Sequence, residues 1–164
     1  MHMEDEAELK KKIIAELGNE DSSIAANAMY QLDKYGWIDD GSLKNAKLMG
    51  ANLFEAFLNG GVDLSGVDLS EATLHRADLT DSNLENATLN QADLRGSLLF
   101  GTKLFNATLR EANLEGAVFD ENTILPDGTH WTEETDMTRF TDPNHPDFWD
   151  ASASKGRHDF ASLS

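Results

Sequence analysis

Leucine recurs at every fifth residue through the middle of this chain, and a small residue stands two places before most of these leucines. The series begins at Leu43, restarts one residue late at Leu64 and then keeps its register to Ile124. Five residues turn an α-helix by about 500°, so successive leucines would spread around a helix rather than share a face. On a strand, an odd spacing would send successive leucines to opposite faces. The pattern therefore predicts a chain that bends once per repeat and stacks its bends into a solenoid around columns of leucine.

The remaining positions of the repeat support a bend after each leucine. The residue before the leucine is commonly Asp, Asn or Thr, whose side chains bond nearby backbone groups and favour turns. Several glycines stand two places after the leucine, where a tight corner with a positive φ would favour them. These glycines are Gly50, Gly66, Gly96, Gly101 and Gly116. The one-residue delay falls within residues 59–62, where the paired glycines Gly60 and Gly61 predict a bulged corner.

Two stretches show the repeat in its clearest form, ADLTD at residues 77–81 and ANLEG at residues 112–116. They resemble the pentapeptide-repeat family, whose consensus is A(D/N)LXX, and the resemblance covers residues 41–124, about half of the chain. The resemblance implies a mainly β fold, a right-handed four-sided parallel β-helix of about four coils with four repeats in each coil. This count predicts four columns of inward residues, of which the first holds Leu43, Leu64, Leu84, Leu104 and Ile124.

Residues 1–40 show helical spacing instead of the five-residue period. The apolar residues of the first predicted helix are Leu9, Ile13 and Leu17, and those of the second are Ile24, Ala28 and Leu32. Asp21 is placed to cap the second helix and Gly36 to end it. This hairpin resembles a single HEAT-type repeat. We interpret it as a cap over the open first coil, with a separate docking module as the alternative.

After Ile124 the register stops at a turn sequence, Pro-Asp-Gly at residues 126–128. Residues 125–150 are predicted to form a C-terminal cap, and their first part resembles an extension found in some bacterial pentapeptide-repeat proteins. The aromatic residues of this segment either fold over the last coil or form a homodimer contact. They are Trp131, Phe140, Phe148 and Trp149. Residues 151–164 are rich in Ser and Ala, and we interpret them as a flexible tail.

The net charge of −17 is spread along the whole chain, and the repeat carries twelve acidic and six basic residues between positions 43 and 124. Direct binding of nucleic acid is not expected, because it normally requires a basic patch. No apolar run is long enough to span a membrane, and no signal peptide is visible. The absence of cysteine excludes disulfides and is compatible with a reducing, cytoplasmic compartment.

The sequence contains no phosphate-binding glycine loop, no HExxH zinc motif and no nucleophile elbow. Its histidines are scattered without the spacing of paired metal ligands. His130 and His145 stand near Asp142 and Asp147, and we interpret them as residues of a solvated loop rather than as metal ligands. We therefore predict no catalytic residue, no cofactor, no metal site and no enzyme activity.

One group of outward residues departs from the polar norm. The fourth face of the predicted β-helix has Leu58, Leu79, Leu99 and Phe119 as its inward residues. The residues directly before them are Phe57, Asp78, Leu98 and Val118. Phe100 projects from the same coil as Leu98, Phe105 lies across the next corner, and Asp81 adds a negative charge nearby. We predict that this strip contacts a protein partner or a second copy of the chain, with scattered surface hydrophobes as the alternative.

Two functions are compatible with such a chain. The first is a non-catalytic scaffold that binds a protein partner, because a rigid repeat surface loses little entropy on binding. The alternative, implied by the family resemblance, is a DNA-mimicking inhibitor or protector of a type II topoisomerase (gyrase), since gyrase-protecting members are acidic rods that imitate duplex DNA. The scaffold is favoured, because the repeat is short and its net charge is only −6.

Overall fold

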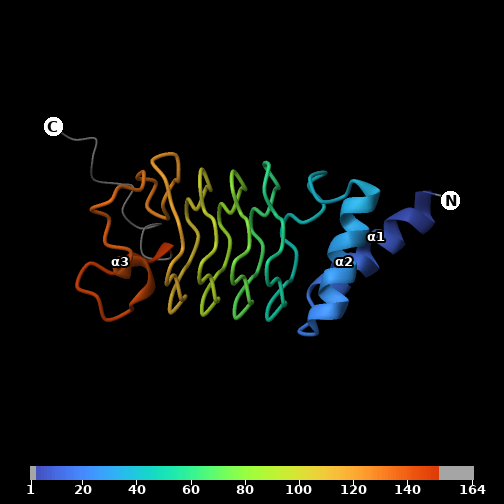
Figure 1. Ribbon diagram of the computed structural model, residues 1–164, viewed down its shortest axis with the longest axis horizontal. Coiled ribbons are helices and arrows are strands. Elements are labelled where there is room, and N and C mark those ends of the chain that lie inside the picture. The colour runs from blue at the N-terminus through green and yellow to red at the C-terminus, as the bar shows by residue number, and fades with distance from the viewer. Residues whose placement is uncertain (1–2, 152–164) are drawn as a thin grey trace, which may run out of the picture.

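The computed structural model describes residues 3–151, so the predicted tail lies outside the described residues except for Ala151. Helix α1 spans Met3–Leu17, α2 spans Ser22–Tyr35 and the short α3 spans Thr138–Thr141. Figure 1 shows α1 and α2 at one end of a row of stacked coils, with α3 at the opposite end. Among residues 3–151, no helix is long and apolar enough to cross a membrane.

Helix α2 begins and ends at the predicted residues. Asp21 caps its first turn by accepting a hydrogen bond from the Ser23 N–H at 2.8 Å. Gly36 ends the helix in the left-handed conformation, with a φ of 67°, and its N–H donates to carbonyl oxygens of the last turn. Both signals could be read from the sequence because they depend only on residues close along the chain.

The buried face of α2 differs from the predicted one by one residue. Ile24 is 39% exposed, and Ala25 lies in the interior with Ala28 and Leu32. The predicted face was therefore wrong at its first position. Both sets lie on one face of the helix, with residues 25, 28 and 32 spanning an arc of about 60° and residues 24, 28 and 32 about 80°. The choice between them depends on how α2 packs against α1.

The helical hairpin is joined to the first coil by a hydrogen bond and by close packing. The Asn52 N–H donates to the Asn19 carbonyl oxygen at 3.1 Å. Trp37 is only 6% exposed and belongs to the same buried cluster as the leucines of the coils. Gly18 approaches the coil so closely that a Cβ at this position would lie 3.1 Å from the Lys47 carbonyl oxygen. The hairpin therefore packs directly against the first coil.

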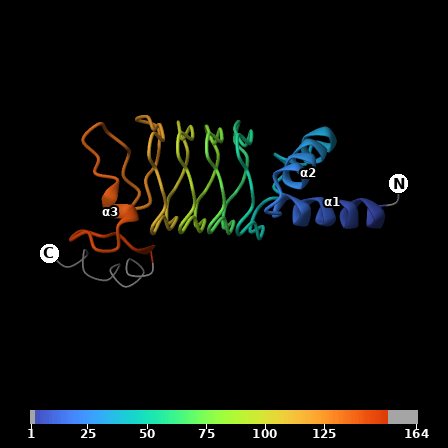
Figure 2. The ribbon, with the colours of Figure 1, turned by 60° about the horizontal axis from the view of Figure 1, so that its bottom comes forward.

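Residues 43–125 form the stacked coils seen in Figures 1 and 2. Parallel bridges join each coil to the next at one residue per repeat, and most partners are 20 residues apart, as in Asp63 and Asn83. Four five-residue repeats therefore make up each coil of this β-helix. Within residues 3–151 every bridge is isolated, because each repeat reaches its next corner before a longer strand forms.

Bridges that leave the first coil span 21 residues instead of 20, as between Phe57 and Asp78. The additional residue is accommodated at Gly60 and Gly61, which have φ angles of 77° and 92°. Such angles are open to glycine at little cost. The bulged corner predicted for residues 59–62 is thus confirmed, and the repeat resumes its register at Leu64.

Each corner is a turn that begins at a leucine and is closed three residues later. The Ala77 N–H, for example, donates to the Leu74 carbonyl oxygen at 3.0 Å. The residue two places after the leucine has a positive φ whether it is glycine or not, as the third residue of a type II turn requires. The non-glycine residues in this conformation are Asn45, Glu55, Glu71, Arg76, Asp81, Asn86, Gln91, Asn106 and Glu111. The positive φ predicted for the glycines is confirmed, and nine corners adopt it without glycine.

The Asp and Asn residues before the leucines support these turns, as predicted. The Asp63 carboxylate accepts a hydrogen bond from the N–H two residues later, that of Ser65, at 3.0 Å. The same bond recurs at Asn52, Asp68, Asp78, Asn83, Asp93 and Asn113. The repeated acidic and amide groups therefore have a structural role in holding the corners.

The leucines of the repeat form the interior, and from Leu43 to Leu109 none is more than 3% exposed. Small inward residues fill the space between them. At residues 97 and 102, where this position is polar, the hydroxyl is paired with the backbone: Ser97 Oγ donates to the Leu94 carbonyl oxygen at 2.8 Å. Thr102 Oγ1 likewise donates to a backbone carbonyl oxygen, that of Leu79, at 2.8 Å. These bonds compensate for the burial of the Ser97 and Thr102 hydroxyls, whereas Ser82 Oγ, at the same inward position of another repeat, is buried without a hydrogen-bond partner.

The inward series shifts by one residue at the last coil. Ile124 pairs with Lys103 across 21 residues and so takes an outward place, while Leu125, 1% exposed, lies in the interior. The expectation that Ile124 ends the first column was therefore wrong. The corner after Phe119, like the bulged corner at residues 59–62, contains one additional residue, because Thr123, rather than residue 122, takes the small inward position and is fully buried.

Candidate interaction surfaces

The residues predicted for the fourth face lie in a single ladder. Parallel bridges join Phe57 to Asp78, Asp78 to Leu98 and Leu98 to Val118, and we call these four residues the fourth-face ladder. Phe57 is 72% exposed and Val118 is 41% exposed, whereas Leu98 is half-buried. The ladder thus places Leu98 and Val118 side by side, with Asp78 between them and Phe57.

The other residues predicted for this surface lie at two corners. The Asp81 N–H donates to the Phe100 carbonyl oxygen at 2.8 Å, so these residues lie on neighbouring coils at the corner after the ladder. Asp81 is exposed and Phe100 is half-buried. Phe105 is 43% exposed, and its ring lies 3.3 Å from the position that a Cβ on Gly128 would take. Phe105 therefore packs against the turn that follows the last coil.

Asp78 places a negative charge within the ladder. Its carboxylate accepts hydrogen bonds from the Thr80 N–H at 3.0 Å and from the Asn59 side-chain amide at 2.7 Å. Burial acts to raise the pKa of Asp78, but these hydrogen bonds outweigh it and lower the pKa below its ordinary value. Asp78 is therefore ionised at neutral pH, between two apolar side chains of the ladder.

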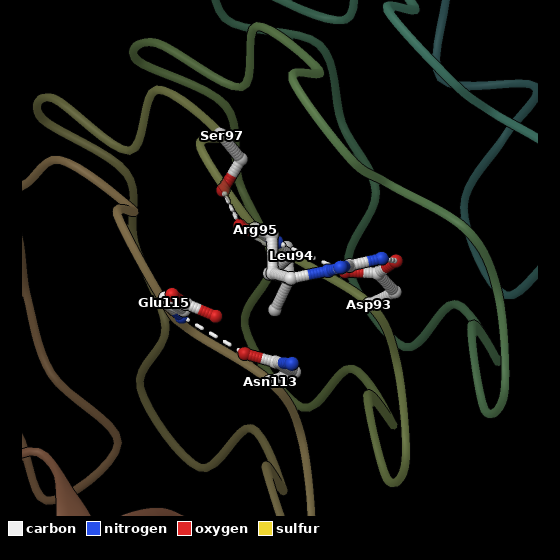
Figure 3. A network of polar contacts seen from close by, with 6 residues as sticks. All are labelled: Asp93, Leu94, Arg95, Ser97, Asn113 and Glu115. Atoms are coloured by element: carbon white, nitrogen blue, oxygen red, sulfur yellow. Dashed lines mark hydrogen bonds and ion pairs between the residues drawn. The ribbon is translucent and has the colours of Figure 1, made fainter.

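The neighbouring third face, which bears Asp93 and Asn113 on bridged coils, carries a polar network in this part. Figure 3 shows Arg95 against Asp93, with Nε 2.8 Å from Oδ1 and Nη2 2.7 Å from Oδ2. The hydrogen bond from Arg95 lowers the pKa of Asp93. On the next coil, Asn113 Oδ1 accepts from the Glu115 N–H at 3.0 Å. This part of the third face satisfies its own charges and is a poor candidate for a ligand site.

The predicted aromatic residues of the C-terminal segment differ in exposure. Phe140, in α3, is 1% exposed and packs edge-on against Trp149, with ring centroids 6.1 Å apart. Trp131 stacks on Phe119 of the last coil at 6.0 Å. Trp131, Phe148 and Trp149 are all half-buried. Phe140 therefore belongs to the interior, and only the other three present surface to solvent.

A groove between α2 and the first coil was not anticipated from the sequence. It has a volume of about 390 Å³, and we call it the α2 groove. Its lining residues are Ser22, Ala25, Ala26, Met29, Asn52, Leu53, Phe54, Glu55, Ala56 and Phe57. Phe54 is 48% exposed and stacks on His75 with ring centroids 5.6 Å apart. An outward phenylalanine directly after Leu53 was a signal in the sequence, but the groove also depends on how α2 packs on the coil, which the repeat does not determine.

Within residues 3–151, no group of three or more His, Cys, Asp or Glu side chains is arranged to hold a metal ion. The two histidines considered from the sequence have separate polar contacts. His130 Nδ1 lies 2.9 Å from the Glu121 carbonyl oxygen, and His145 Nε2 lies 3.2 Å from Asp136 Oδ2. Neither arrangement brings the two histidines to one site.

The repeat register is matched by a known family. The family model for pentapeptide repeats matches eight copies in this chain, over residues 60–96 and 97–124. The chain belongs to the pentapeptide-repeat family. The matched residues begin at the bulged corner, and the first coil at residues 43–58 of this pentapeptide-repeat protein follows the same spacing. No curated protein matches the chain.

Several solved structures of pentapeptide-repeat proteins are similar to parts of the chain. One, from the thylakoid lumen of Arabidopsis thaliana, is 28% identical over 59% of this chain and 70% of that protein, with a TM-score of 0.42. Another, from Nostoc PCC 7120, is 30% identical over 71% of this chain and 92% of that protein, with a TM-score of 0.31. QnrB1, a plasmid-mediated fluoroquinolone resistance protein, is 22% identical over 54% of this chain and 53% of its own, with a TM-score of 0.27. Membership of the family rests on the repeats themselves rather than on these partial superpositions.

Proposed function

We propose that this pentapeptide-repeat protein is a non-catalytic module that binds a protein partner through the surface of its solenoid. The observation that carries the proposal is the fourth-face ladder, where Phe57 and Val118 are 72% and 41% exposed on bridged coils. Apolar side chains that gather on a surface are typical of protein contact sites. Because the bridges fix the backbone before binding, little conformational entropy is lost when a partner docks.

The charges around the ladder favour a basic partner. Asp78 lies within the ladder and Asp81 lies exposed at the adjoining corner. The chain as a whole carries a net charge of −17, which would attract a positively charged protein and accelerate its association. A homodimer is the second arrangement that the apolar residues support, either through the ladder or through the half-buried aromatics Trp131, Phe148 and Trp149.

The finer architecture that we propose is a right-handed, four-sided β-helix over residues 41–124, capped by residues 1–40 and 125–150. The 20-residue spacing between bridged residues supports four sides, because four repeats with one corner each make up a coil. The packing of Trp37 and Phe140 into the interior supports a cap at each end. We further propose a cytoplasmic location, with which a chain free of cysteine is compatible.

The test is capture of partners from the native host by the purified full chain and by the double variant Leu98→Ser, Val118→Ser. Met49→Ser is the control, because Met49 is 57% exposed and lies outside the ladder. We expect the double variant to bind its partner at least tenfold more weakly, about 1.4 kcal/mol, with a melting temperature within a few degrees of the wild type. An unchanged partner list and unchanged affinity in the double variant would contradict a role for the ladder.

The alternative is a DNA-mimicking inhibitor or protector of gyrase, which the strongly acidic composition favours. Ion pairs interrupt the negative surface, as between Arg95 and Asp93 and between Arg76 and Glu55, and this weakens the alternative. A supercoiling assay with purified gyrase separates the two functions. Strong inhibition, or protection from a fluoroquinolone, would favour the DNA mimic over the scaffold.

A further inference from the structure

The α2 groove is a hollow with a mainly apolar lining. Seven of its ten lining residues are apolar, and two of these, Phe54 and Phe57, are 48% and 72% exposed. A volume of about 390 Å³ lies within the range of sites that take apolar groups. The groove therefore offers space and apolar surface for a few side chains of another molecule.

The walls of the groove are held in place before anything binds. Phe54 and Phe57 lie on either side of the corner formed by residues 53–56, which is closed by the Ala56 N–H donating to the Leu53 carbonyl oxygen at 3.1 Å. The Phe54 ring stacks on His75, and the backbone of Phe57 is bridged to Asp78 on the next coil. The opposite wall is α2, which extends for about 21 Å over its 14 residues. Docking into a preformed groove of this kind loses little entropy.

The charges at the groove are negative. Glu55 is the only charged residue among the lining residues, and no Lys or Arg is among them. Glu55 pairs with Arg76 at 3.4 Å, but both side chains are more than half exposed, and such a pair contributes little. Asp78, which is ionised at neutral pH, adjoins Phe57, and Asp33 follows Met29 by one helical turn on the same side of α2. An occupant with basic side chains beside its apolar ones would complement these charges.

We propose that the α2 groove is the docking site for a short amphipathic helix of a protein partner, with its apolar side chains in the groove and its Lys or Arg side chains toward Glu55 and Asp78. This inference rests on the proposed function, since it names the segment that a protein-binding module would take. Helices that bind in grooves use apolar anchors at positions i, i+3, i+4 and i+7. The groove runs beside α2, so the incoming helix packs against α2 and the corner formed by residues 53–56.

The test uses the full chain and two fluorescein-labelled peptides of about 15 residues, a length at which isolated helices become marginally stable. Both peptides carry Leu at the anchor positions, and their remaining positions are Lys in one and Glu in the other. Binding is measured by fluorescence anisotropy at about 0.15 M salt, where long-range attraction to the acidic chain is screened beyond about 8 Å. We expect the Lys peptide to bind and the Glu peptide to bind at least tenfold more weakly.

Ala26→Arg and Met49→Arg form a matched pair of variants. Both residues are exposed, and both substitutions add one positive charge, but only Ala26 lines the groove. Arginine is a good helix former, so Ala26→Arg leaves α2 intact, which a melting curve checks. We expect Ala26→Arg to weaken binding of the Lys peptide at least tenfold and Met49→Arg to leave it within about twofold of the wild type.

Four results would overturn the proposal. Failure of the wild type to bind the Lys peptide excludes helix docking. If Ala26→Arg and Met49→Arg reduce the affinity for the Lys peptide equally, the peptide is held by general charge attraction instead of by the groove. Equal binding of the Glu peptide excludes a basic partner. Self-association of the wild type in sedimentation that Ala26→Arg abolishes identifies a second copy as the occupant. If any of these occurs while capture of a partner still depends on Leu98 and Val118, docking of a basic partner helix in the groove is excluded and the proposed function stands.

Discussion

Shortening Leu84 to alanine is the most direct test of the inward columns. Leu84 is fully buried, and it lies midway along its column, one coil from Leu64 and one from Leu104. Removing three carbons from this position forfeits about 2.5 kcal/mol at about 0.8 kcal/mol for each buried CH₂. The cavity adds to this, because the bridged backbone on both sides limits collapse, so we expect a total loss of about 3–4 kcal/mol.

The loss is measured by urea unfolding followed by circular dichroism. It would be a large part of the stability of a domain this size, which is typically about 5–15 kcal/mol. Met49→Ala is the control, because Met49 is 57% exposed and its truncation should change the free energy of unfolding by less than about 0.5 kcal/mol. If Leu84→Ala lost less than about 1 kcal/mol, or no more than the control, the assignment of Leu84 to a packed column would be refuted.

Gly101 and Gly116 both have positive φ, so replacing either with alanine should lower the stability by about 1 kcal/mol or more, measured in thermal melts. A Cβ on Gly101 would meet the Asp81 carboxylate, but this exposed side chain can turn away, so we expect similar losses at the two positions. Unchanged melting in either variant would contradict the strain argued for these corners. Thr123→Val removes the hydrogen bond from Thr123 Oγ1 to the Leu99 carbonyl oxygen and should lower the free energy of unfolding by about 1 kcal/mol, measured in urea. Four aspartates of the coils have pKa values lowered below 3.8 in the folded chain, mainly by hydrogen bonds at their corners. They are Asp63, Asp78, Asp93 and Asp120. An aspartate with a lowered pKa stabilises the fold at pH values above its pKa in the unfolded chain, and this stabilisation is lost as the pH falls through its pKa in the folded chain. The urea concentration at the unfolding midpoint should therefore decrease below about pH 4. Between about pH 5 and 7 these groups should change the midpoint little.

The parts of the fold that could be predicted from the sequence depend on residues close together along the chain. The five-residue period identifies the inward leucines, because each corner is closed within its own repeat. The cap at Asp21 and the end of α2 at Gly36 are equally local. Even the fourth-face ladder follows by counting, once the additional residue near Gly60 is included.

The parts that could not be predicted depend on how separate segments pack. Helical spacing alone did not decide between Ile24 and Ala25, because both choices give a continuous apolar face. The inward position moves from Ile124 to Leu125 because the corner at residues 120–123 has one additional residue. This corner contains no glycine, so the sequence gives no indication of it comparable to Gly60 and Gly61. The α2 groove is formed by two segments that the repeat does not place relative to each other, which is why Phe54 was missed as a candidate contact.

Neighbouring coils are joined by one bridge in each repeat, and this arrangement also determines how the molecule would respond to a pulling force. The coils are held to one another by short, regularly spaced backbone contacts, with a 20-residue interval between bridged residues. Pulled from its two ends along the solenoid axis, the chain would peel away one coil at a time rather than break as a single unit. Each step would release about 70 Å of contour length, at about 3.4 Å for each of the 20 residues. A single-molecule extension trace should therefore show a short staircase of nearly equal steps, so that the protein behaves mechanically as an extensible tether with a repeating unit.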